Sequence, residues 1–389
     1  MRSATRAARP AAAAEMPIGP LGIIPDERLQ LMPRSVIPRH EFCFWLHDQI
    51  ARLLVEASHC GQIDDWNEAV SDALQGIPDA IHPDNVLIAI AEAGGIISIP
   101  MKIDILSAVL SDTLHFVYEA LRALEKRKFN VAFSLLRKPF SENLIILARL
   151  AANDDDFISS FADGSLQQKQ ITNIDASKRV ELFESAISKL PIQSPFSGAL
   201  INDIIFNKNM PNGLQIRMQQ ATHLITSHHP SLLTPKLDIN RIFSNQYGDE
   251  NFSAYDSLPV IIFFILQIVL YMFSRYLAVS EKSTNEILVR ASGIYTNIYE
   301  GRLDSLSRYM NVALKGFFKC EWCVEGNAKI RKAFSADFYL RDQIFCTECR
   351  RLSHTPLTYL LRSGKLNIIE KERKFPSEYE RLFLRDADH

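Results

Sequence analysis

Apolar residues recur at helical intervals along most of the chain from His40 onward. In residues 40–59 this spacing places Phe44, Ile50, Leu53 and Leu54 near one face. The same pattern predicts helices over 64–76, 85–93, 103–126, 129–153, 176–190, 197–206, 212–227, 284–301 and 303–314. Serial alternation of apolar and polar positions, which is typical of strands, is absent from this part of the sequence. The pattern therefore predicts an all-α fold, a multi-helix bundle over residues 36–314.

Two local features modify this pattern. Pro139 falls inside the helix expected over 129–153, where it removes a backbone donor and should kink the helix. The run Asp154-Asp155-Asp156 follows that helix. Aspartates at such a junction accept hydrogen bonds from the free N–H groups of the next helix, so we expect a cap there rather than a metal site.

The most apolar stretch runs from Leu258 to Phe273 and is interrupted only by Gln267. A membrane-spanning helix needs about 20 consecutive apolar residues, and this run of sixteen is shorter. Its mixture of β-branched and aromatic residues suits a helix buried on all sides. We therefore predict a central core helix and no membrane association, with a membrane span as the alternative.

The two ends of the chain carry weaker signals. Residues 1–35 contain several prolines and no clean period, which predicts a disordered leader. The apolar stretch Ala11–Ala14 is too short for the core of a secretory signal, so we expect a cytoplasmic protein. The basic, alanine-rich start leaves an organelle-targeting peptide open, as well as a native start at Met16. Residues 367–389 are interpreted as a C-terminal tail.

Four cysteines provide the strongest chemical signal. Cys320 and Cys323 form one CxxC pair, and Cys346 and Cys349 form another, 22 residues further on. Two such turns supply four thiolates, the ligand set of a tetrahedral zinc site. Because all four positions are filled, no site is open for a catalytic water, and the predicted Zn²⁺ is structural.

The other two cysteines, Cys43 and Cys60, lie on or beside an apolar helical stretch and are interpreted as buried thiols. In a chain without an export signal, this distribution favours metal binding in a reducing compartment over disulfides.

Residues 315–366 are expected to form a separate zinc module. The segment 333–345 between the CxxC pairs is rich in aromatic residues, which favours strands, and the segment 350–366 is predicted to be helical. A knuckle, a short hairpin and a second knuckle leading into a helix resemble a treble-clef zinc module. The resemblance implies binding to nucleic acid, binding to protein, or a purely structural role.

Charge is distributed unevenly in a chain of otherwise ordinary globular composition, with 47% hydrophobic and 23% charged residues. Residues 315–374 contain 13 Lys/Arg against 7 Asp/Glu, a net charge of +6, whereas residues 1–314 have a net charge of −6. The basic set comprises Lys319, Lys329, Arg331, Lys332, Arg341, Arg350 and Arg351, interleaved with Trp322, Phe334, Phe338 and Tyr339. Such a mixture suits single-stranded nucleic acid. It is also consistent with a purely structural role, in which the aromatic residues form the core of the module and the charged residues its solvated surface.

Signatures of common enzyme classes are absent, including the P-loop, GxGxxG, HExxH and GxSxG. Arg217 and His223 form an R-x5-H motif on an expected helix, and this spacing resembles that of the HEPN helical bundles. The resemblance implies a metal-independent ribonuclease in which His223 acts as acid or base and Arg217 stabilises phosphate charge. The spacing also occurs at Arg34 and His40, and about two matches are expected by chance in a chain with this many arginines and histidines. His223, His228 and His229 do not have the spacing of three or four that aligns ligands on one helix face.

The segments LLRKPFSENLIILARL, DDDFISSF and ATHLITSHHPSLLTPKLDINRIFS are similar to segments of uncharacterised bacterial all-helical proteins. This resemblance assigns no catalytic residue. The sequence as a whole predicts a binding or regulatory protein whose basic zinc module contacts nucleic acid or protein. The alternative is a HEPN-type ribonuclease of a bacterial defence or toxin system.

Overall fold

The computed structural model describes residues 20–59, 98–163, 174–193, 195–210, 212–223, 249–277, 279–299, 305–323, 328–362, 366–368 and 382–384, with single positions between these ranges. The helix expected over 85–93, most of the one expected over 64–76, and Cys60, His228 and His229 lie outside the described residues.

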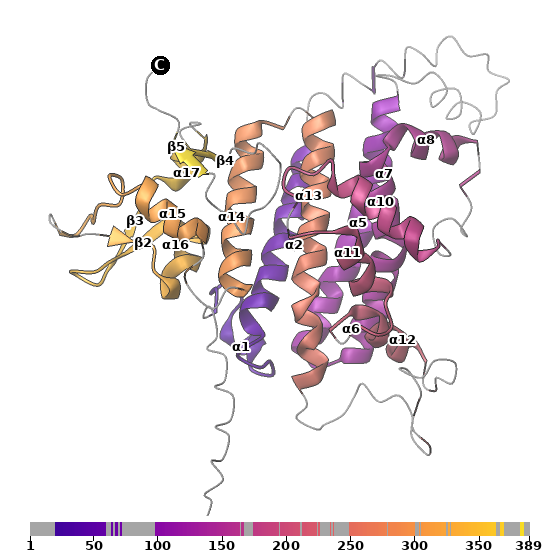
Figure 1. Cartoon of the computed structure of the whole chain (residues 1–389), viewed down its shortest axis with the longest axis horizontal. Helices are drawn as coiled ribbons and strands as arrows, with labels where there is room; N and C mark the ends of the chain where they lie inside the picture. The colour runs from indigo at the N-terminus through magenta and orange to yellow at the C-terminus, as the bar shows by residue number, and fades with distance from the viewer. Residues whose placement is uncertain are drawn as a thin grey trace, which may run out of the picture.

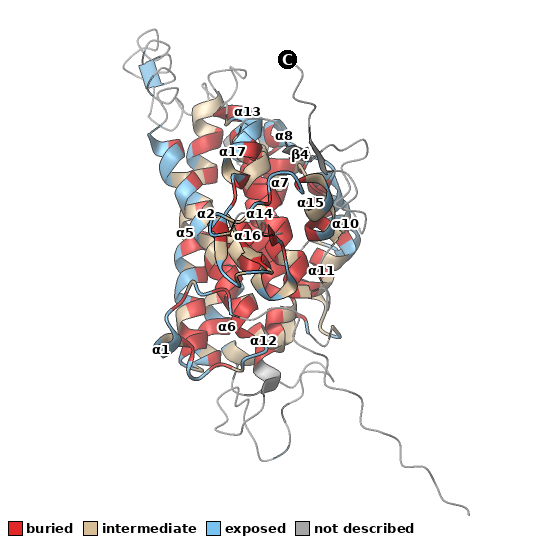
Figure 2. Ribbon diagram, turned by 90° about the vertical axis from the view of Figure 1, so that its left-hand side faces the viewer, coloured by how far each residue is buried: buried red, intermediate tan, exposed pale blue. Residues whose placement is uncertain are grey.

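The described part of the chain is a helical bundle with a small sheet-containing module at one side, which confirms the predicted fold class (Figure 1). The bundle contains α1 (Asp26–Leu29), α2 (Ile37–Ser58), α5 (Ser98–Glu125), α6 (Phe129–Lys138), α7 (Leu144–Ala152), α8 (Asp154–Ala162), α10 (Ala176–Ile187), α11 (Gly198–Phe206), α12 (Leu214–Thr222), the 3₁₀ segment η4 (Asp249–Asp256), α13 (Leu258–Tyr276), α14 (Glu281–Tyr299) and α15 (Ser305–Ala313). Buried positions line the inner sides of these helices (Figure 2).

Helix α13 is the centre of the bundle, and 16 of its 19 residues are buried. Its one interior polar side chain, Gln267, accepts a hydrogen bond from the backbone N–H of Ile192 at 2.9 Å, which satisfies its carbonyl oxygen. The stretch Phe252–Tyr276 is long and apolar enough to cross a membrane, and 89% of its most apolar window is buried inside the protein. The prediction of a helix buried on all sides is confirmed, and the absence of membrane association remains a prediction.

The kink expected at Pro139 takes the form of a π-helical turn, Pro139–Asn143, between α6 and α7. A π turn contains one more residue than an α turn, so its hydrogen-bond pattern can pass the proline, which has no N–H to donate. Asn143 is buried at this turn and donates to Asp112 Oδ2 at 2.7 Å and to Thr113 Oγ1 at 3.0 Å. The turn is therefore fixed against α5.

The cap expected from the aspartate run is supplied by a different residue. Asn153 accepts a hydrogen bond from the backbone N–H of Asp156 and caps α8. Asp154 is instead only 2% exposed, and it forms ion pairs with Lys102 Nζ at 2.6 Å and Arg275 Nη1 at 2.8 Å. This aspartate links α5, α8 and α13, a role that its position at the start of a helix did not indicate.

The N-terminal segment differs from the expected disordered leader. From Pro20 the chain is packed against the bundle, and the buried carboxylate of Glu41 accepts hydrogen bonds from the backbone N–H groups of Leu21, Ile23 and Ile24 at 2.5, 2.8 and 3.1 Å. Three donors on one carboxylate fix the turn that precedes α1. Residues 1–19 lie outside the described part of the chain.

The C-terminal module contains a three-stranded antiparallel sheet of β1 (Ala328–Lys329), β2 (Gln343–Cys346) and β3 (Leu352–His354), in that order. The segment whose aromatic content favoured strands contains helix α16 (Ser335–Arg341), and the prediction of strands is wrong for these residues. Phe338 and Tyr339 of this helix are buried in the core. The segment expected to be one helix begins with β3, and α17 (Leu357–Arg362) follows. Residues assigned to the tail contain β5 (Leu382–Leu384), which pairs with β4 (Leu366–Ile368).

Candidate metal centre

The four cysteines of the two CxxC pairs come together at one end of the three-stranded sheet. Their sulfur atoms all lie within 4.8 Å of one another. Cys320 Sγ is 3.5 Å from Cys349 Sγ, and Cys323 Sγ is 3.7 Å from Cys346 Sγ, distances that exclude a disulfide bond. The predicted convergence is confirmed, and the cluster could hold a metal ion.

Gly326 allows the backbone to approach this cluster closely. A Cβ atom at this position would lie 2.5 Å from Cys323 Sγ and 2.7 Å from Cys346 Sγ, which is too close for any side chain. Its N–H donates to the carbonyl oxygen of Cys323 at 3.3 Å and closes the first knuckle. The glycine three residues after a CxxC pair is therefore part of the site, although the sequence analysis did not single it out.

Hydrogen bonds to sulfur favour the thiolate form of Cys320. Its Sγ accepts from Ser353 Oγ at 3.4 Å and from the backbone N–H of Trp322 at 3.4 Å. The hydrogen bond from Ser353, supported by those from the backbone N–H groups of Trp322 and Cys323, lowers the pKa of Cys320 to about 6. Burial and the adjoining sulfurs raise the pKa of Cys323 to about 12. Four sulfurs this close ionise together only when a cation neutralises them, which is the condition that a bound metal meets.

The sheet register places the ligands on its buried face. Cys346 and Ile344 are buried and alternate with half-buried positions in β2, and Ser353 lies opposite Ile344 in β3. The turn between β2 and β3 contains Cys349 and passes through Arg350, whose φ of 59° is left-handed. The backbone N–H of Cys346 donates to the carbonyl oxygen of Arg351 at 2.9 Å and holds this turn closed.

The aromatic residues of the module have three different roles. Phe338 and Tyr339 are fully buried and belong to its core. Phe334 is half-buried and stacks on Phe345, with ring centroids 4.4 Å apart and planes at 5°. Trp322, between the first two cysteines, is 57% exposed. Phe338 and Tyr339 therefore belong to the module's own core, as one of the two interpretations of the sequence proposed, whereas Trp322 lies on the surface.

Basic side chains dominate the exposed surface of this module. Among the described residues from 315 to 351, the exposed Lys and Arg side chains are Lys315, Lys319, Lys329, Arg331, Arg341, Arg350 and Arg351, and Lys332 is half-buried. The exposed acidic residues in the same described range are Glu321 and Glu348. The positive charge that the sequence indicated is therefore displayed at the surface.

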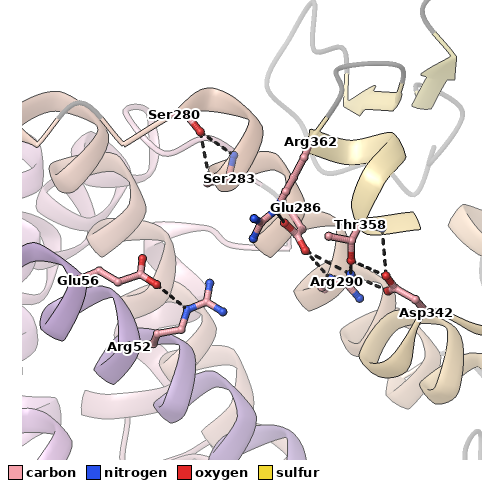
Figure 3. A network of polar contacts seen from close by, with 9 residues as sticks. All are labelled: Arg52, Glu56, Ser280, Ser283, Glu286, Arg290, Asp342, Thr358 and Arg362. Carbon is pink, nitrogen blue, oxygen red and sulfur yellow. Dashed lines mark hydrogen bonds and ion pairs between the residues drawn. The ribbon is translucent and has the colours of Figure 1, made fainter. Parts of the chain in front are cut away.

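Arg290 of α14 joins the bundle to the module (Figure 3). Its guanidinium donates at 2.6 Å to the carbonyl oxygen of Tyr339, to Asp342 Oδ1 and to Thr358 Oγ1. Asp342 ends α16 in a left-handed conformation and accepts a hydrogen bond from the backbone N–H of Thr358 at 3.1 Å. One bundle side chain thereby fixes two helices of the module.

The proposed ribonuclease pair is not arranged as the sequence predicted. Arg217 is half-buried within α12, whereas His223 follows the last residue of that helix, with extended backbone and an exposed side chain. The two residues therefore do not project from one continuous helix. The spacing of Arg217 and His223 alone could not reveal that the helix ends at Thr222.

A buried polar cluster escaped the sequence analysis. His40 and Glu125 are both fully buried, and His40 Nε2 lies 3.3 Å from Glu125 Oε1. The hydroxyl of Tyr255 lies 2.6 Å from His40 Nδ1. Burial raises the pKa of Tyr255 well above its ordinary value, so this hydroxyl donates to Nδ1 and the N–H at Nε2 donates to Glu125. Arg28 donates two hydrogen bonds to the same carboxylate, and Arg122 Nη1 donates to Glu125 Oε2 at 3.0 Å.

Comparisons of the chain with protein-family models, with curated proteins and with solved structures found no match. Function is therefore inferred from the geometry of this chain.

Proposed function

We propose that this protein is a non-enzymatic nucleic-acid-binding protein, whose C-terminal module is held folded by one structural zinc ion. A tetrahedral zinc site with metal–sulfur bonds of about 2.3 Å has sulfur–sulfur separations of about 3.8 Å. Two of the sulfur pairs, at 3.5 and 3.7 Å, are close to this separation, and all four sulfurs lie within 4.8 Å of one another, which supports a site of this size. A closed set of four thiolates stabilises structure and provides no position for a catalytic water.

The exposed basic surface of the module carries the argument for the partner. Its described residues from 315 to 351 include seven exposed Lys and Arg side chains and only two exposed acidic side chains. Arg341 is engaged by Asp337 at 2.9 Å, while Lys319, Lys329, Arg331 and Arg350 lie around the cysteine knuckles and the sheet. A dense set of cations on one small unit matches the phosphate backbone of nucleic acid.

The proposal is tested by measuring oligonucleotide binding by the zinc-loaded full chain at several salt concentrations. Phosphate neutralisation predicts affinity that falls steeply with salt, and Lys329→Ala/Arg331→Ala should weaken binding and flatten this dependence. The exposed bundle lysines Lys128 and Lys178, replaced together by alanine, are the matched control. Absence of binding by the wild-type protein, or equal losses in both double variants, would contradict the proposal.

A further inference from the structure

We propose that Trp322 is a stacking platform for one unpaired base, so that the module prefers single-stranded nucleic acid to duplex. This inference rests on the proposed nucleic-acid function and names the class of nucleic acid and the residue that selects it. Trp322 is 57% exposed although indole is among the most apolar side chains. A large exposed aromatic ring within a basic surface is typical of sites for single strands.

The ring is held in place before any ligand arrives. Trp322 Nε1 donates to the carbonyl oxygen of Leu352 in β3 at 2.9 Å, and its backbone N–H donates to Cys320 Sγ at 3.4 Å. Trp322 also lies between two cysteines of the cluster, so both ends of its backbone are restrained. Binding to a ring that is already fixed loses little side-chain entropy, which favours its use in recognition.

The ring lies beside charges of both signs: Arg351 contacts it, and Glu321, the residue before it, is exposed. The guanidinium of Arg351 lies over the indole, 5.4 Å from the ring centroid, and Arg350 precedes it in an exposed turn. A base stacked on the indole would bring its own phosphates toward these guanidinium groups. Stacking and phosphate neutralisation would then act on the same nucleotide.

The other aromatic rings of the sheet are already engaged. Phe345 is covered by Phe334 at 4.4 Å and carries the guanidinium of Arg331 at 5.3 Å from its centroid. This pair contributes to the fold of the module. Trp322 also carries a guanidinium, that of Arg351, but its side chain is 57% exposed, whereas Phe345 is half-buried.

Duplex nucleic acid has few unstacked bases that could stack on this ring. Each base inside a duplex is stacked between its neighbours, whereas bases of a single strand can turn outward onto an aromatic side chain. The contribution of Trp322 should therefore appear with single strands and be nearly absent with duplex.

The test compares binding of fluorescein-labelled single strands of about 12 nucleotides, oligo-dT and oligo-U, with a duplex of equal length. All measurements use the zinc-loaded full chain. Trp322→Ala should lower affinity for the single strands by about 5- to 100-fold and leave duplex affinity nearly unchanged. Trp322→Phe keeps an aromatic face and should recover much of the loss. Tyr359→Ala removes another exposed aromatic residue (64% exposed), in α17, and is the matched control.

Each result has one meaning. Equal binding of single strands by wild type and Trp322→Ala, while Lys329→Ala/Arg331→Ala binds weakly, overturns the stacking site and leaves the proposed function standing. Absence of binding by wild type overturns both. Zinc content confirms that each variant module is folded. If Trp322→Ala loses zinc, then Trp322→Phe decides, because its ring is smaller. Single-strand affinity that is reduced while duplex affinity is unchanged supports the stacking site, and affinities that are both unchanged or both reduced equally overturn it.

Discussion

Gly293 of α14 lies directly against the ring of Tyr339 in α16, where a Cβ atom would be 2.2 Å from two ring carbons. Tyr339 is fully buried, and its hydroxyl lies 3.0 Å from Ser307 Oγ in α15. This ring cannot move aside without breaking that hydrogen bond and opening the interface. The glycine therefore sets how closely the module docks on the bundle.

Gly293→Ala should destabilise the protein because the added methyl group collides with a confined aromatic ring. Overpacking of this kind costs about 1–3 kcal/mol. The measurement is the free energy of unfolding from chemical denaturation. Gly316→Ala is the matched control, since a Cβ there would meet no heavy atom within 4 Å. Equal stability of the two variants would contradict the close approach.

Purified protein should contain about one zinc ion per chain, measured by elemental analysis. Cys320→Ser and Cys346→Ser should lose the metal and unfold the module, because such sites draw folding free energy from the ion. Gly326→Ala should also lower zinc occupancy, because its methyl group would occupy space beside two sulfurs.

Cys43 provides the control for this prediction, because it is buried in α2 and lies outside the cluster. Cys43→Ala should retain the zinc of the wild type even if it lowers stability. Freshly purified wild-type protein without zinc would disprove the assignment of the metal.

Some parts of this structure could be predicted from sequence because short-range patterns determine them. The apolar run that became α13 and the two CxxC pairs each carry their signal within a few neighbouring residues. The aromatic content of the segment that forms α16 predicted strands, but its Phe338 packs on Phe318 and its Tyr339 on Gly293 of α14, and both are buried from a helix.

Other parts depend on partners that are distant in the chain. His40 contacts Glu125 and Tyr255, which are 85 and 215 residues away. Asp154 contacts Arg275, which is 121 residues away, whereas its local position at the start of a helix pointed to a cap. No pattern in a single sequence connects such residues. Their roles appear only when the helices are packed.

Phe264→Ala should destabilise the protein by about 3–5 kcal/mol, because it leaves a cavity in the central helix as well as losing transfer free energy. Phe264 is fully buried and packs against Phe183 and Phe196, with ring centroids 6.2 and 5.6 Å away. Val131→Ala, at a site 51% exposed, should change the free energy of unfolding by less than about 0.5 kcal/mol. Fractionation tests the same helix, since a core helix leaves the wild type in the supernatant without detergent. Protein that stays with membranes after carbonate extraction would contradict this.

Acid should weaken the cluster around Glu125. Burial alone would raise the pKa of this carboxyl, but hydrogen bonds from His40 and Arg28 outweigh burial and lower the pKa from 4.5 to about 2. As the pH falls, Glu125 therefore takes up a proton near pH 4.5 in the unfolded chain but only near pH 2 in the folded protein. The stabilisation is complete above pH 4.5 and is lost as the pH falls toward 2.

Burial also lowers the pKa of His40 below its ordinary 6.5, although Glu125 opposes this effect. The unfolded state again takes up a proton first, so stability begins to fall as the pH drops below about 6.5. Both groups therefore act in the same direction, in two adjoining pH ranges.

Glu125→Gln tests this cluster because it removes the charge while retaining the shape of the side chain. At pH 7 the variant should be less stable than wild type by about 1–3 kcal/mol, since Arg28, Arg122 and His40 lose a charged acceptor. The difference should shrink between pH 4.5 and pH 2, where the wild-type carboxyl takes up its proton. Glu119→Gln, at an exposed position of the same helix, is the control. The measurement is the free energy of unfolding by urea across this range. A difference between wild type and Glu125→Gln that stays constant from pH 7 to pH 2.5 would show that the stabilisation does not come from the charge of Glu125.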